Sequence, residues 1–217
     1  MDWSPLVISI KTSIAGTGIA LLLGIPAARL VANMRGKSRA ILDGVFTLPM
    51  VLPPTVLGFF LLVIFGRNSP VGQLLLSFGI RVIFSWEATV IAAAVVAFPL
   101  VYRTVRASFE QIDRSVLHAA KTLGLSERTI FLKIMIPMAR PGIAGGTILA
   151  FARALGEFGA TIMIAGNIPG RTQTIPVAIY FAAEGGNMQG ALVWVIIIVL
   201  ISFSVVALLN TVGENRQ

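Results

Sequence analysis

The chain of 217 residues has no cysteine, one histidine and few charged residues, which make up 12% of it. Without cysteine there is no disulfide framework and no thiolate to bind a metal or act as a nucleophile. With His118 as the single histidine, zinc sites of the HExxH type and histidine-based catalytic triads are excluded. An ordinary soluble domain is about a quarter charged, so the shortage of charge excludes a soluble globule. We therefore expect no metal site, no cofactor and no catalytic centre in this chain.

Hydrophobic residues make up 56% of the chain and gather in long stretches. A membrane-spanning helix needs about 20 mostly apolar residues. Four stretches without any charge, and a fifth with two charges near its centre, come close to this length. The five predicted spans cover residues 12–28, 44–66, 88–102, 142–165 and 185–213. The sequence thus predicts an all-α integral membrane protein with five core transmembrane helices, in a single domain over residues 1–217.

Two further apolar stretches are shorter than a span. Residues 73–84 and 175–183 are too short to cross a bilayer, and the first of them also contains Arg81. The sequence leaves open whether they form re-entrant or interfacial segments.

The 17 Lys and Arg residues outnumber the 9 Asp and Glu residues and are unevenly placed. With five spans, the loops 34–41 and 103–141 and the C-terminal tail lie on one side and hold 11 basic residues, whereas the other side holds three. Cytoplasmic loops of membrane proteins carry the excess of Lys and Arg. The N-terminus is therefore predicted outside and the C-terminus in the cytoplasm. The chain has a net charge of +8, but its long uncharged stretches argue against a nucleic-acid-binding protein.

The cytoplasmic loop, at about residues 103–141, has a pattern of its own. Apolar residues recur at helical spacing over 116–123. Gly124 then interrupts the pattern, and Ser126 is placed to cap a second short helix. The loop is therefore predicted to fold as a helix, a glycine turn and a helix. The alternative is a solvated basic loop between two spans.

Two prolines follow this second short helix. Pro137 and Pro141 are expected to stop it near Lys133 and to begin a new helix. Proline removes a backbone N–H group but is tolerated in the first turn of a helix. A two-helix unit bounded by glycine and proline can move as a rigid body.

The same loop resembles the EAA loop of ABC importer permeases. That motif reads Glu-Ala-Ala, three residues, Gly, nine residues, Ile, one residue, Leu-Pro. The matching residues are Ala119, Ala120, Gly124, Ile134 and Pro137, and the departures are His118 for Glu and Ile136 for Leu. The resemblance implies a cytoplasmic two-helix coupling loop that docks on a separate ATPase subunit, here without the carboxylate of the family's Glu.

Two more stretches narrow the resemblance. Residues 48–58 and 151–176 resemble the permease subunits of molybdate ABC transporters. The resemblance covers nearly the whole chain and implies a type I ABC importer permease-like fold in the plasma (inner) membrane of a prokaryote. It implies a transport subunit and not an enzyme, with ATP hydrolysis on separate ATP-binding subunits and an extracytoplasmic oxyanion-binding protein that delivers the substrate.

The implied function is ATP-driven import of an oxyanion, with molybdate as the first expectation. Tungstate and sulfate or thiosulfate stay open, because permeases for these anions resemble the chain in the same regions. An ATP-independent anion channel is the alternative of another class. Five spans are few for enclosing a pathway, so we expect a homodimer with the pathway on its two-fold axis.

Two predicted spans contain residues that a lipid-facing helix does not need. Arg153 and Glu157 lie four residues apart, hence on one helical face, and each is costly alone at membrane depth. They are predicted to pair, either to lock the helices together or to line the translocation pathway. Pro53 and Pro54 interrupt the second span, and such a break must face protein or water. Thr55 follows with a hydroxyl that could bind an oxyanion, the alternative being a plain kink.

Overall fold

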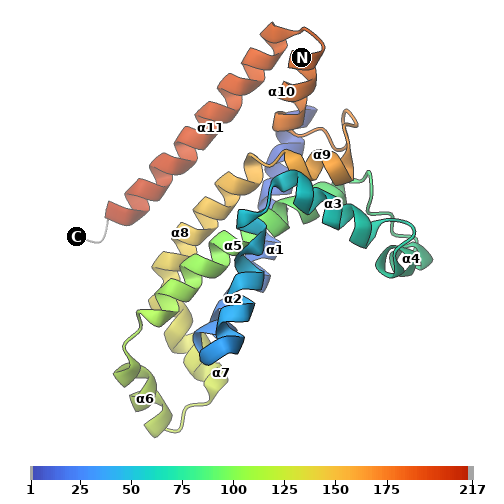
Figure 1. Cartoon of the computed structure of the whole chain (residues 1–217). Coiled ribbons are helices and arrows are strands. Elements are labelled where there is room, and N and C mark those ends of the chain that lie inside the picture. Colours follow the sequence, from blue (N-terminus) through green and yellow to red (C-terminus); the bar gives the residue numbers. More distant parts are fainter. Residues whose placement is uncertain (1, 215–217) are drawn as a thin grey trace.

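The computed structural model describes residues 2–214 of the chain, with side chains as far as residue 207. Within these residues every regular element is a helix, as predicted, and the longest helices run alongside one another in an elongated bundle (Figure 1). The elements are α1 (Ser4–Ala32), α2 (Gly36–Val51), α3 (Pro54–Phe65), α4 (Pro70–Ser77), α5 (Trp86–Glu110), α6 (Arg114–Thr122), α7 (Glu127–Ile130), the π-helical turn η1 (Phe131–Met135), α8 (Ile136–Leu155), α9 (Gly159–Ala165), α10 (Ile175–Glu184) and α11 (Met188–Glu214).

Four helices are long and apolar enough to cross a membrane. They are α1, α5, the continuous helix from Glu127 to Leu155, and α11 as far as Ala207. The pair α2 and α3 makes a fifth if it is counted as one bent span. The five predicted spans are thus confirmed when α2 and α3 are counted as one span. The short helix α10 coincides with the apolar stretch 175–183, whereas α4 covers only residues 73–77 of the stretch 73–84, whose second half is a loop.

The second predicted span is not one helix. Its halves α2 and α3 meet at an angle of 111°, and the chain between them is extended at Leu52 and Pro53. Pro53 and Pro54 lack the N–H groups that would continue the helix, and a residue before proline avoids the α conformation. With 16 residues, α2 is about 24 Å long. It therefore ends short of the hydrocarbon thickness of about 30 Å.

The fourth predicted span, residues 142–165, is wrong at both ends. Its helix begins at Glu127, because α7, η1 and α8 follow one another without interruption, and it ends at Leu155. After a short break α9 begins at Gly159. The apolar stretch predicted neither end of this helix. The first half of the helix carries charges and lies outside the stretch, and the helix ends before the stretch does.

The prolines do not stop this helix where predicted. The expected end near Lys133 lies within η1, Pro137 belongs to the first turn of α8 and Pro141 lies inside α8. In η1 the N–H of Ile136 donates to the carbonyl of Phe131, which makes this turn one residue wider than an α turn. Proline disrupts an α-helix because its ring clashes with the carbonyl four residues earlier. The wider turn before Pro137 relieves that clash.

The central helix of the bundle is α5, and α1 and α8 pack along it. Both contacts depend on glycine. A Cβ on Gly16 of α1 would lie 2.8 Å from the Cβ of Ala93, and a Cβ on Gly146 of α8 would lie 3.2 Å from the Cβ of Thr104. Close approach at small residues is the usual way for helices to pack within a bilayer. The peripheral helix α11 presents large apolar side chains outwards, as a lipid-facing helix does.

Candidate functional site

The breaks in the two interrupted spans lie against each other. α9 packs on α3, and a Cβ on Gly159 would lie 2.8 Å from the Cβ of Pro54. One turn further along, a Cβ on Gly58 would lie 2.9 Å from the Cα of Ala160. Glycine at these positions therefore lets the two chain segments touch. We call this region the elbow, comprising residues 52–58 and 153–160.

Glu157 is the buried acid of the elbow, with 3% of its surface exposed. Its Oε2 lies 2.7 Å from Nη1 of Arg153, so the predicted pairing is confirmed. Its Oε1 accepts a hydrogen bond of 2.8 Å from the N–H of Ala160 in the first turn of α9. Glu157 does not share a helical face with Arg153 as predicted, because it lies beyond the end of α8. The carboxylate thus joins the end of α8 to the start of α9.

The other side of the elbow is open in the single chain. Pro53, Pro54 and Thr55 are exposed, and the Arg153 side chain is 36% exposed. Backbone without hydrogen-bond partners is not tolerated against lipid, so protein or water has to cover this face. The structure brings the five predicted pathway residues into one region, namely Pro53, Pro54, Thr55, Arg153 and Glu157.

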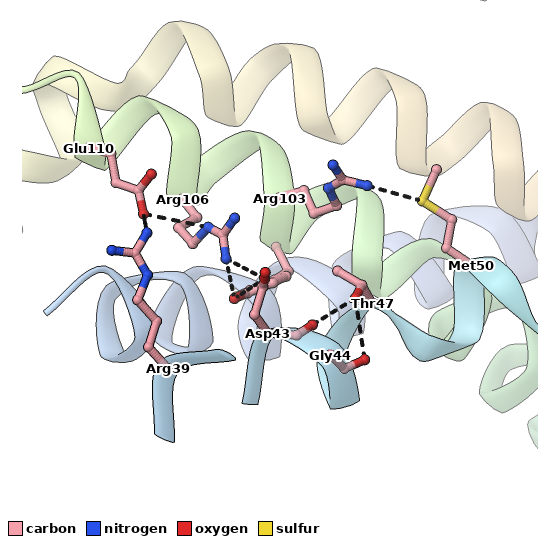
Figure 2. A network of polar contacts seen from close by, with 9 residues as sticks. Arg39, Asp43, Gly44, Thr47, Met50, Arg103, Arg106 and Glu110 are labelled. Atoms are coloured by element: carbon pink, nitrogen blue, oxygen red, sulfur yellow. Dashed lines mark hydrogen bonds and ion pairs between the residues drawn. The ribbon is translucent and has the colours of Figure 1, made fainter. Parts of the chain in front are cut away.

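A polar network joins α2 to α5. Figure 2 shows Arg106 of α5 between two acids, Asp43 of α2 and Glu110 of α5. Glu110 also pairs with Arg39 of α2 at 2.5 Å, and Asp43 accepts a hydrogen bond of 2.9 Å from the hydroxyl of Tyr102. No residue of α2 is fully buried. The network, together with the packing of Phe46 on Phe98 and Tyr102, holds α2 against α5, and α2 leads directly into the elbow.

The predicted helix, glycine turn and helix is confirmed in α6 and α7. Between them Gly124 has a φ of +75°, which residues with a side chain adopt only with strain. Asp113 caps α6 by accepting a hydrogen bond of 2.8 Å from the N–H of Ser115, and this bond lowers the pKa of the Asp113 carboxyl. Ser126 caps α7 through the N–H of Thr129. We call this unit, which projects from one end of the bundle (Figure 1), the knob, residues 111–130.

The predicted coupling residues fall into two groups. His118, Ala119 and Gly124 lie exposed on the knob. Ala120 faces inwards and belongs to the core. Ile134 and Pro137 are half-buried in the long helix that follows the knob. The knob also presents Leu123, which is 79% exposed, at its tip.

Sequence reasoning missed the residue that ties the knob to the bundle. Arg29 in the last turn of α1 donates from Nη2 to the carbonyl of Glu127 at 2.9 Å, and the same nitrogen lies 3.5 Å from the Glu127 carboxylate. Its guanidinium also lies 4.3 Å from the centre of the Phe131 ring in η1. Such stacking together with hydrogen bonding suits arginine better than lysine. The partners are 98 residues apart, and no local pattern connects them.

Residues 20–213 match the family described as the inner membrane component of binding-protein-dependent transport systems. The chain belongs to this family. Among its relatives, a putative molybdenum transport system permease of Bacillus subtilis is 46% identical over 202 residues, which cover 93% of this chain and 89% of the relative. The molybdenum transport system permease of Escherichia coli K12 is 43% identical over 206 residues, covering 94% and 90%.

Solved transporters share the fold of this family member. A bacterial ABC transporter for the import of alginate matches with a TM-score of 0.72 at 16% identity, covering 100% of this chain and 81% of the other. An inward-facing methionine ABC transporter matches with a TM-score of 0.70 at 17% identity, covering 96% and 94%. The chain is thus a multi-pass membrane permease with the type I ABC importer fold, as the sequence predicts.

Replacing Arg153 alone leaves the buried Glu157 carboxylate without its counter-charge. Arg153→Met is therefore expected to lower the free energy of unfolding by about 3 kcal/mol. The double variant Arg153→Met/Glu157→Gln should recover most of this loss, because no buried charge remains. Thermal unfolding of the purified protein in detergent measures both, with Arg128→Met on the exposed knob as the control. A double variant less stable than Arg153→Met would contradict this account.

Proposed function

We propose that two copies of this chain form the translocation pathway of an ATP-driven importer of an oxyanion, and that the oxyanion is molybdate. The observation that carries the proposal is the 43–46% identity, over more than nine-tenths of the chain, to permeases named for molybdenum transport. The whole chain acts as one permease domain. ATP hydrolysis takes place on separate subunits, and an extracytoplasmic binding protein supplies the anion.

The elbow supports a pathway between two copies. Its open face carries a helix break that cannot face lipid, and a second copy related by a two-fold axis would enclose it. There the Thr55 hydroxyl donates a hydrogen bond to the passing oxyanion. Arg153 supplies positive charge, and Glu157 holds its guanidinium in place. The α2 network sets the position of Thr55 from the other side.

The knob supports coupling to an ATPase subunit in the cytoplasm. It projects from the bundle, exposes apolar Leu123 at its tip and has Gly124 in a conformation that fixes its shape. The helix Glu127–Leu155 has 29 residues, about 44 Å, and leads from the knob to the elbow. A push on the knob therefore reaches Arg153 through one rigid element. With the knob in the cytoplasm the N-terminus lies outside, as the distribution of basic residues also favours.

Reconstitution tests the function. The chain is purified with its ATPase, placed in vesicles and supplied with the binding protein and labelled molybdate. We expect uptake that requires ATP and is not reduced by a hundredfold excess of sulfate. Uptake without ATP would identify a channel. Uptake of sulfate or tungstate in preference to molybdate would overturn the assignment of the anion.

The knob's turn gives a prediction with a matched control. Gly124 has a positive φ, which proline cannot adopt, so Gly124→Pro should abolish substrate-stimulated ATP hydrolysis and leave membrane insertion intact. Gly186 ends α10 with the same pair of backbone hydrogen bonds and a φ of +77°. Gly186→Pro should retain the bound ATPase on purification, whereas Gly124→Pro should lose it.

A variant of the knob's tip separates docking from folding. Leu123→Asp changes an exposed side chain, so the protein should melt as the wild type does but bind the ATPase at least tenfold more weakly. Leu123→Met should bind normally. Unchanged coupling in both Gly124→Pro and Leu123→Asp would refute the docking role of the knob.

A further inference from the structure

One part of the chain extends away from the bundle. This arm, residues 54–84, consists of α3, α4 and the loop that leads to α5, with α4 at its far end (Figure 1). α4 has eight residues, about 12 Å, and cannot cross a membrane. Large apolar side chains on the arm are nevertheless exposed, among them Phe60, Leu74 at 60% and Phe78 at 73%. An exposed apolar element of this kind requires a lipid or protein surface.

The arm also lines a half-open cavity of about 490 Å³ between α3, α4 and the following loop. Its walls are largely apolar, with Phe65, Leu76 and Ile83 among the lining residues. The charged residues that line this cavity are Arg67 and Arg81. The cavity thus combines an apolar interior with positive charge from two separate loops.

No acid balances this charge within the arm. Residues 54–84 contain two arginines and neither Asp nor Glu. Both arginines are exposed, and neither belongs to an ion pair within the described part of the chain. Exposed arginines elsewhere, such as Arg114 and Arg128 of the knob, also have no acidic partner among the described residues, but Arg67 and Arg81 line one cavity together. The cavity therefore carries two positive charges and no negative one from the arm.

The wall of the cavity is fixed to the bundle at Phe84. Within the described residues Phe84 alone among non-glycine residues has a positive φ, of 60°, a conformation that costs about 1 kcal/mol or more. Its N–H donates to the carbonyl of Ile164 in α9 at 3.0 Å. A Cβ on Gly166 would lie 3.1 Å from the Phe84 ring. The contacts with α9 and Gly166 thus hold Phe84 in this conformation as one wall of the cavity.

We propose that this cavity binds a phospholipid with an anionic headgroup. An acyl chain occupies the apolar interior, and the guanidinium groups of Arg67 and Arg81 bind the phosphate. A free inorganic anion would leave the apolar lining unoccupied, and a zwitterionic lipid would bring no net negative charge to the two guanidinium groups. The site requires only that the chain spans a membrane, so it stands whether or not molybdate is the substrate.

Lipid retention in detergent tests the proposal. The full chain is purified and mixed with phosphatidylglycerol or phosphatidylcholine, and native mass spectrometry counts bound lipids. A basic residue near an anionic lipid surface contributes about a fivefold gain in binding, so Arg67→Gln/Arg81→Gln should weaken phosphatidylglycerol binding about twenty-fivefold. Arg67→Lys/Arg81→Lys should retain most of it. Arg114→Gln/Arg128→Gln on the knob makes the same change in charge and should leave retention unchanged.

A second variant tests the apolar part without changing charge. Leu76→Trp fills the cavity and should reduce phosphatidylglycerol retention, while the melting temperature checks that the protein is folded.

Equal retention of both lipids by the wild type, or displacement of phosphatidylglycerol by millimolar inorganic phosphate, would overturn the proposal. So would a loss of binding-protein-stimulated ATP hydrolysis in Arg67→Gln/Arg81→Gln that is the same in vesicles of either lipid, because the arm would then be a protein docking surface.

Discussion

A backbone N–H or carbonyl without a partner cannot remain in the hydrocarbon of a bilayer, and this constraint decides how the two broken spans are arranged. The breaks at Pro53–Pro54 and at Gly156–Phe158 lie against each other, where glycines allow the chains to touch. Glu157 satisfies one free N–H and pairs with Arg153. The face that stays open has to meet water or a second copy. The proposed pathway between two copies of the chain would cover this face.

The long helix from Glu127 to Leu155 gives the elbow a mechanical connection. At one end Arg29 of α1 contacts this helix, with a hydrogen bond to the carbonyl of Glu127 and its guanidinium over the ring of Phe131. At the other end Arg153 reaches the buried carboxylate of the elbow. The π turn before Pro137 keeps the knob and the elbow on one continuous helix. Under the proposed function, this helix carries the movement of the knob to the elbow.

Local patterns predicted much of the fold. Charge-free windows found α1, α5 and α11, because apolar length is the main requirement for a span. Spacing found the Arg153–Glu157 pair, and Gly124 and Ser126 marked the turn of the knob. The π turn was not predictable, because proline ordinarily ends a helix and nothing in the sequence marks the wider turn. The contacts of Arg29 with Glu127, and of Asp43 with Arg106, join residues far apart in the chain. They follow from packing, which local spacing does not encode.

The absence of cysteine makes the central claim directly measurable. A single Thr55→Cys variant, assembled with its ATPase and binding protein in membranes, is treated with a membrane-impermeant maleimide. If the elbow faces an aqueous pathway, Thr55→Cys is labelled, whereas Phe203→Cys is not, because Phe203 is 73% exposed on the apolar helix α11 and is expected to face lipid. Labelling of Thr55→Cys no faster than that of Phe203→Cys would contradict the account.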